Sequence, residues 1–436
     1  MSNSNKTIGL KEAISIGIGG MVGGGIFAVL GLAVSLAKGG TPIAFLIAGI
    51  IALLTSYSYV KLTKKFPDRG GTVRFINEGF GKTIFSGSIN NLLWVSYIIM
   101  LSLYASAFGS YAQNLLPLVN KTIDFHIYAS AIIILATAIN YYSIKVVSKI
   151  ESYSVIIKLI ILLGFVGVGI YGLEGNPHLE QLQITNWETP LQLLTGGMVI
   201  FLAYEGFELI ANAAPDIKDP DKNISKAYFY SVIFVILLYI IIAIVTVGSL
   251  SFETIKKAEE YVLAEAAKPV LGQVGFTVIT IAAMISTFSA INASLYGGSR
   301  VSYEIAEDDE LPHSLTDSFW NHPIGLLITA ILNLILTNTL NLESISTAGS
   351  IGFLLIFATV NFVGFKLSNK INGSKFIHII GFLFCLIASI TLITQQFKDN
   401  LIGVVISVSI IASCLLGEFI YKTYFDHQNS KKVNNR

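Results

Sequence analysis

Long apolar stretches separated by short polar segments run along almost the whole chain. Twelve of them approach or exceed the roughly 20 residues that a helix needs to cross a bilayer. They lie near residues 11–37, 42–61, 83–116, 127–144, 150–172, 190–213, 226–249, 271–302, 323–340, 344–366, 376–395 and 400–421. Barrel strands would instead alternate over about ten residues, and a helix satisfies its own backbone in lipid. The pattern predicts an all-α integral membrane protein with 12 transmembrane helices and no separate soluble domain.

Composition strengthens this interpretation and removes other classes of protein. Charged residues make up 13% of the 436 residues, about half the level of a soluble domain, and the mean hydropathy is +0.69. A net charge of +1 argues against a nucleic-acid binder. Cys385 and Cys414 both lie in apolar runs, so no disulfide framework or zinc site can be built from them.

The distribution of basic residues predicts the orientation of the chain. If both termini face the cytoplasm, 21 Lys and Arg residues fall on the inside and 6 on the outside. Such a bias is typical of multi-pass proteins of the cell membrane. One basic residue of the 28, Lys158, falls within a span.

Glycines crowd the first stretch and predict a break in its helix. Six of the nine residues from 17 to 25 are glycine, and each costs about 1 kcal/mol relative to alanine in a helix. An unwound segment here would offer backbone amides to an anionic ligand. The alternative is close helix packing, because Gly19 and Gly23 have the G-x-x-x-G spacing.

A second interruption follows in the sixth stretch, where Gly196 and Gly197 precede the segment 201–208. Glu205 and Glu208 are costly in a membrane unless they face protein or water; alternatively, Glu208 only pairs with a polar group on another helix. Breaks near residues 23 and 204 predict an inverted-repeat transporter within one domain, 1–436. The repeats would be 11–172 and 190–366, with 376–421 appended.

Lys158 and the eighth stretch are the other polar features inside the spans. Lys158 lies about 12 Å into the fifth stretch at helical rise. The alternative is that its side chain extends to the cytoplasmic interface, which becomes strained at this depth. Burial penalises the charged form of a lysine, which suits a group that exchanges protons. In the eighth stretch Ser286, Ser289 and Asn292 follow one another at three-residue spacing and predict a polar stripe.

Four segments together resemble the amino acid–polyamine–organocation transporter family. Residues 21–27 (MVGGGIF) are similar to its first-helix signature and residues 201–208 (FLAYEGFE) to its sixth-helix motif. Residues 219–225 and 302–312 are similar to the loops after helices six and eight. Within the family the chain most resembles the archaeal ApcT-type proton-coupled transporters, which also carry a lysine in helix five. It departs from the family pattern in the first of these loops, where Asp219 and Ser225 replace asparagine and proline.

The resemblance implies a LeuT-like inverted repeat of five plus five helices, with two extra C-terminal helices. It implies that the substrate carboxylate lies on the amides of residues 23–25, with the ammonium facing carbonyls near Gly19 and in residues 202–205. Lys158 would lie between the Gly19 backbone and Ser286 or Ser289. The residues expected at the substrate site are Gly19, Met21, Gly23, Gly24, Gly25, Ile26, Phe201, Leu202, Ala203, Tyr204 and Glu205.

We therefore expect a secondary active transporter, not an enzyme, that carries amino acids with protons by alternating access. Lys158, Ser286 and Ser289 would form the coupling site, without metal or cofactor other than the proton. The expected partners are an amino acid and the lipid bilayer, and no nucleic acid. The alternative is an amino acid or polyamine exchanger of the same fold: Lys158 argues against polycations, whereas Glu205 leaves them open. A channel would need a continuous polar pore, and a membrane enzyme would need His or Asp motifs that the sequence lacks.

Overall fold

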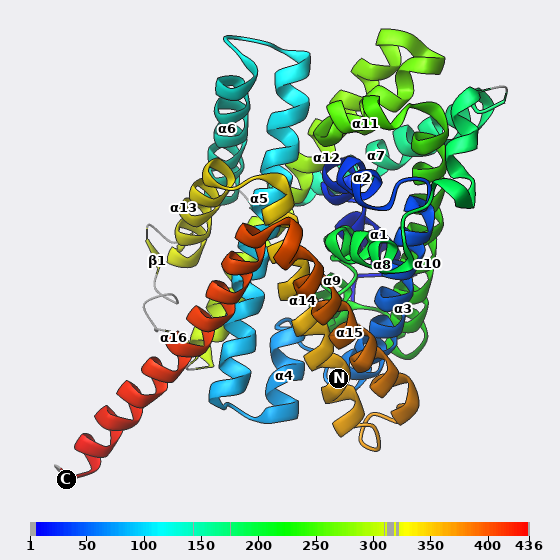
Figure 1. Ribbon diagram of the computed structural model, residues 1–436. Coiled ribbons are helices and arrows are strands. Elements are labelled where there is room, and N and C mark those ends of the chain that lie inside the picture. The colour runs from blue at the N-terminus through cyan, green and yellow to red at the C-terminus, as the bar shows by residue number, and fades with distance from the viewer. Residues whose placement is uncertain are drawn as a thin grey trace.

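The computed structural model describes residues 6–142, 144–174, 176–308, 310–311, 318–319 and 322–434, which are almost entirely helical (Figure 1). The only strands in these ranges are an antiparallel pair of two residues each, β1 (Ser318–Phe319) and β2 (His322–Pro323). The all-α prediction is confirmed. Position 143 of the predicted fourth span and positions 309 and 312 of the loop motif lie outside the described residues.

Nine helices within the described ranges are long and apolar enough to cross a membrane. They are α3 (Thr41–Lys65), α5 (Ile84–Leu115), α6 (Lys121–Tyr142), α7 (Ile144–Gly172), α10 (Pro220–Ser249), α12 (Val262–Glu307), α14 (Leu342–Lys366), α15 (Lys375–Asp399) and α16 (Leu401–Asn434).

Two further spans are bent pairs of helices. α1 (Leu10–Met21) and α2 (Gly25–Ala37) meet at 46°. α8 (Pro190–Val199) meets the segment Phe201–Asp216 at 53°; this segment contains η4 (Phe201–Tyr204), α9 (Leu209–Ala213) and η5 (Ala214–Asp216). Both breaks lie where the sequence predicts them.

A shorter apolar helix, α13 (Ile324–Thr339), occupies the position of the predicted ninth span. Its 16 residues rise about 24 Å, less than the roughly 30 Å hydrocarbon core of a bilayer. The count of 12 spans therefore stays a prediction that depends on α13.

The connecting segments contain more structure than the sequence pattern indicated. They include α4 (Thr72–Phe80), η2 (Pro177–Leu182), η3 (Ile184–Asn186), α11 (Phe252–Lys257) and η6 (Glu259–Tyr261). α12 begins at Val262 and is kinked at Gly272, a non-helical residue with φ of 57°, a conformation that a residue without Cβ adopts readily. The helix after this kink begins close to residue 271, where the sequence predicts the start of the eighth span.

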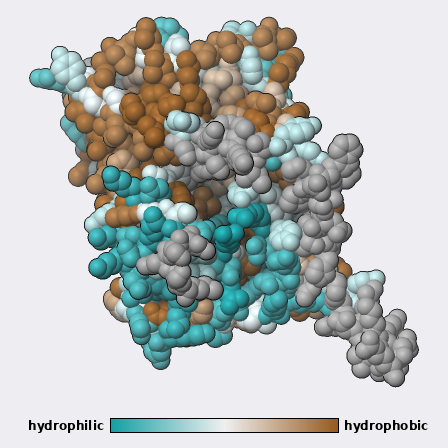
Figure 2. Space-filling view, turned by 180° about the vertical axis from the view of Figure 1, so that it is seen from behind, coloured by the Kyte–Doolittle hydropathy of each residue, from teal (hydrophilic) through white to brown (hydrophobic). Residues whose placement is uncertain are grey.

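Apolar side chains cover much of the outer surface as well as the interior. Ile134, Ile160, Ile390 and Leu416 are more than half exposed, on α6, α7, α15 and α16 respectively. In Figure 2 brown apolar atoms gather over the upper part of the face in view, and teal polar atoms gather at the lower end. Water would not tolerate so large an apolar surface, so it is explained by surrounding lipid.

The two bent spans contact each other in the middle of the molecule through glycine. A Cβ added to Gly20 would lie 2.6 Å from the carbonyl oxygen of Gly206, and Gly206 itself has φ of 118°. A Cβ on Gly25 would lie 2.8 Å from Ala203 Cα. Glycine is needed at these positions because backbone meets backbone there. α3, α5, α10, α12 and α14 surround the pair.

Candidate substrate and coupling site

The first break leaves carbonyl oxygens that side chains from three other helices satisfy. Lys158 Nζ on α7 donates to Gly19 O at 2.9 Å, and Tyr239 Oη on α10 donates to Met21 O at 2.7 Å. Ser286 Oγ on α12 donates to Gly23 O at 2.8 Å. The unwound carbonyls are thus held by donors, as buried backbone groups require.

The backbone amides of the same break, unlike its carbonyl oxygens, lack hydrogen-bond partners among the described residues. The last helical hydrogen bond before the break runs from Val22 N to Ile18 O, and the next one along the chain runs from Ala28 N to Gly24 O. The amides of Gly23 and Gly24 have no acceptor in the described part of the chain. A helix beginning at Gly25 also presents its first amides and the positive end of its dipole. This arrangement suits an anionic group such as a carboxylate.

The second break is held by serines of α14 and by a carboxylate. Ser346 and Ser350 donate to Val199 O at 2.6 and 3.0 Å, and Leu202 N donates to Ser350 Oγ at 3.3 Å. Gly206 N donates to Glu208 Oε2 at 2.7 Å.

Glu205 and Glu208 are both buried, each 1% exposed, and the structure assigns them different surroundings. Glu208 also accepts from Tyr97 Oη at 3.1 Å. Its contacts are therefore those of a structural acceptor, in line with the alternative interpretation of its sequence. Glu205 lies beside it, and its Oε1 has no hydrogen-bond partner among the described residues. A buried acceptor in this condition can receive a donor from a ligand.

One tyrosine links the two breaks. Tyr239 Oη lies within hydrogen-bonding distance of both Met21 O, at 2.7 Å, and Ala203 O, at 3.1 Å. The sequence motifs do not include this residue. The available signal is a lone hydroxyl within the otherwise apolar run of residues 232–245.

Lys158 is 1% exposed, and the structure brings it to the first break. Gly19 permits this approach, because a Cβ there would lie 2.8 Å from Val155 Cγ2 on the same helix as Lys158. Ser286 donates to Gly23 O, and Ser289 is buried nearby on α12 at 2% exposure. Asn292, the third residue of the predicted stripe, accepts from Asn140 of α6 at 3.0 Å and so belongs to a separate contact.

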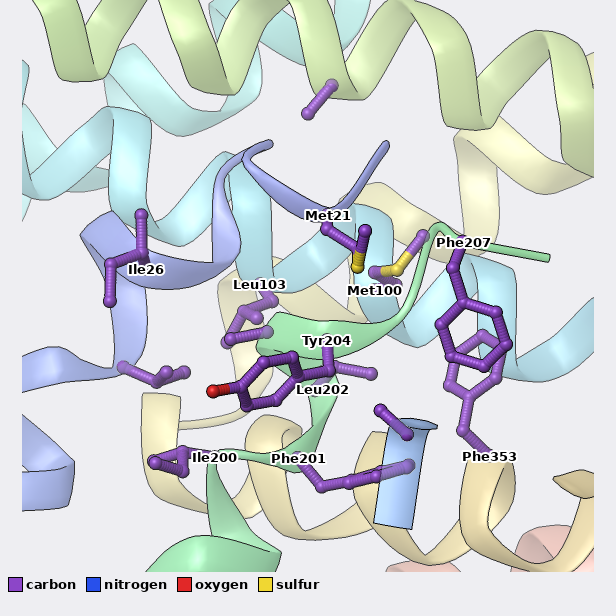
Figure 3. Packing of buried hydrophobic residues seen from close by; sticks show 14 of the residues in the cluster. Met21, Ile26, Met100, Leu103, Ile200, Phe201, Leu202, Tyr204, Phe207 and Phe353 are labelled. Atoms are coloured by element: carbon purple, nitrogen blue, oxygen red, sulfur yellow. The ribbon is translucent and has the colours of Figure 1, made fainter. Parts of the chain in front are cut away.

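The remaining predicted substrate-site residues are apolar and enclosed. Met21, Ile26, Phe201, Leu202, Ala203 and Tyr204 are each at most 1% exposed. Figure 3 shows most of them in one cluster, with Met100 and Leu103 of α5 among them. Tyr104 closes over Gly24, since a Cβ at Gly24 would overlap its ring. The site is closed in this conformation.

Comparison with known proteins finds membrane transport proteins of similar sequence. The family model described as amino acid permease matches residues 8–420. The inner membrane transport protein YbaT of Escherichia coli is 33% identical over 403 residues, which cover 92% of each chain. In Bacillus subtilis, a methylthioribose transporter is 24% identical, covering 84% of this chain and 82% of its own. The branched-chain amino acid permease BcaP is 23% identical, covering 84% and 81%.

Proposed function

Because this chain belongs to the amino acid permease family, whose members are transporters, we propose that it carries amino acids together with protons across the cell membrane. One observation carries the proposal: the amides of Gly23 and Gly24 have no acceptor in the described chain, and the buried Lys158 donates to Gly19 O, four residues before Gly23. The first feature suits the substrate carboxylate, and the second suits the coupling proton.

The substrate carboxylate would bind at the start of α2. Here the amides of residues 23–25 and the helix dipole act in the same direction. Carboxylates bound by several amides form charge-assisted hydrogen bonds, which are about twice as strong as neutral ones.

The substrate ammonium would lie toward the second break. Glu205 offers a buried carboxyl whose Oε1 has no partner in the described chain, and the backbone of residues 202–205 supplies carbonyls. A substrate with both charged groups would therefore connect the two breaks, whereas an amine or an acid alone would satisfy only one.

Lys158 would couple this binding to a proton. Protonated, it donates a charge-assisted bond to Gly19 O and holds α7 against the first break. When it loses the proton, that bond weakens and α7 can separate from α1. Lysine can make this change whereas arginine cannot, because a guanidinium keeps its proton in proteins.

Alternating access is supported by contacts that close the site on two sides. On one side, η6 contacts α2 at Gly31, which has no Cβ to keep the Glu259 backbone away. On the other, Phe207 lies edge-on to Tyr59, with ring centroids 5.5 Å apart, and against Phe357 at 5.2 Å. Opening the contact at Gly31 would expose the two breaks to one side of the membrane, and opening the Phe207 contacts would expose them to the other.

Uptake by reconstituted protein tests the proposal. Labelled amino acids should accumulate in proteoliposomes when an inward proton gradient is imposed. Lys158→Ala and Lys158→Arg should both lose the stimulation by the gradient. Lys256→Ala, which alters an exposed lysine of α11 far from the breaks in sequence, serves as the control and should keep it. Undiminished concentrative uptake by Lys158→Ala would refute the coupling role.

Competition separates the substrate class from the coupling. Zwitterionic amino acids should compete, and analogues lacking the carboxylate or the ammonium should compete poorly. Methylthioribose has neither group, so competition by it as effective as that by amino acids would contradict the proposed substrate class.

A further inference from the structure

A crevice of about 780 Å³ lies between α5, α13 and α16, on the side of the molecule and apart from the two breaks. Its long walls are apolar, formed by Trp94, Val95, Leu336, Val405, Ile406 and Ile410. Along α16 the small residues Ser409, Ser413 and Gly417 recur every four positions and form a shallow channel on one helix face. Since α16 lies at the outside of the bundle (Figure 1), this crevice faces lipid.

One end of the crevice is polar and contains two buried carboxylates. Glu310 is 1% exposed and accepts from Asn90 Nδ2 at 2.6 Å. Glu418 is fully buried, accepts from Asn91 Nδ2 at 3.1 Å, and pairs with Lys422 Nζ at 3.4 Å. Both carboxylates line the crevice.

This end has fewer cations than carboxylates. Asp308, at its edge, pairs with Lys82 at 3.0 Å, so in the described chain Lys422 is left to face both Glu310 and Glu418. Burial raises the pKa of Glu310 despite the opposing effects of Asn90 and Lys422. A buried carboxylate without full compensation is costly, and a second cation would offset that cost.

An acceptor without a donor lies at the same place. Asn91 lines the crevice and is 7% exposed, and its Oδ1 has no hydrogen-bond partner among the residues that the structure describes. Buried polar atoms are normally paired. A positively charged hydrogen-bond donor would pair with this amide oxygen and would also offset the charge of the two carboxylates.

We propose that this crevice binds an aminophospholipid, with its ammonium among Glu310, Glu418 and Asn91 and an acyl chain along α16. A primary ammonium supplies both the charge and three donors. The apolar walls leading from the carboxylates favour a lipid over a free amine, because an acyl chain packed along them adds van der Waals contacts that a free amine cannot make. Tyr421 and Tyr424 also line the polar end, as tyrosines do at headgroup depth.

Binding of defined lipids to the purified full-length protein tests this site. Phosphatidylethanolamine and phosphatidylcholine with the same acyl chains should be compared by native mass spectrometry and thermal unfolding. Ethanolamine lipid should bind about tenfold more tightly, the factor expected for one hydrogen bond to a charged group. Phosphatidylcholine has the charge without donors, and free ethanolamine has the donors without the chain, so both should bind weakly.

Two variants locate the effect. Glu418→Gln should remove the preference for ethanolamine over choline. Ser413→Leu fills the channel while keeping both carboxylates, and should weaken both lipids. Val408→Leu adds bulk on the 52% exposed, opposite part of α16 and is the control.

Three results would overturn the proposal. They are equal binding of the two lipids by the unaltered protein, preferential binding of anionic phosphatidylglycerol, and a dimer that Ser413→Leu dissociates. The last result would identify a second copy of the chain as the occupant.

Discussion

Gly25 is the residue at which the smallest change should have the largest effect on substrate binding. A side chain there meets the Ala203 backbone at 2.8 Å, and overpacking of this kind costs about 1–3 kcal/mol. Gly25→Val should therefore abolish amino acid binding, because it pushes the two breaks apart and covers the amides at the start of α2.

The measurement is equilibrium binding of a labelled amino acid to purified, monodisperse protein. Gly297→Val is the matched control, since a Cβ at Gly297 meets nothing within 4 Å, and it should bind normally. Retention of unchanged affinity by Gly25→Val would remove this glycine from the site.

At the scale of elements, α14 acts as the support of the second break. Ser350 accepts from Leu202 N and donates to Val199 O, which also accepts from Ser346, so Ser350→Ala leaves the buried Leu202 amide without an acceptor while Val199 O keeps Ser346. One unsatisfied buried group costs about 1–3 kcal/mol. We expect a lower midpoint of thermal unfolding and weaker substrate binding.

Ser389→Ala is the control for this prediction. Ser389 is equally buried, but its hydroxyl bonds Cys385 O four residues back in its own helix, a contact that adds little stability. The two variants should differ clearly in unfolding midpoint, and equal midpoints would show that α14 does not support the break.

The elements that were predictable from the sequence are those with a strong local signal. The apolar stretches indicated the long helices, and the glycines at 17–25 and the segment 201–208 indicated both bends. These features depend on residues close together in the chain, where helix propensity and the cost of burying charge act directly.

Other features depend on which distant residues meet, and sequence spacing does not contain that information. Tyr239 could not be placed on Met21 O and Ala203 O without the packing of α10. Asn292 was grouped with Ser286 by periodicity, yet it pairs with Asn140 across a different helix contact. The helices α4 and α11 were missed because they have only 9 and 6 residues, and neither forms a long apolar run of its own.

At the scale of the whole molecule, orientation in the membrane is the main remaining prediction. Both native cysteines, Cys385 and Cys414, are buried, so introduced cysteines can be labelled with little background. Lys256→Cys should react with an impermeant maleimide added outside intact cells, and Arg69→Cys should react only after the membrane is opened. The reverse pattern would place both termini outside.

The backbone contact between Gly20 and Gly206 has a consequence for how the molecule can move. Neither residue has a side chain that could change rotamer, and Tyr239 holds a carbonyl of each bent span with one hydroxyl. The two bent spans should therefore move as one unit, so that a rotation of one span also rotates the other. Conformational exchange measured at either span should then show a single common rate.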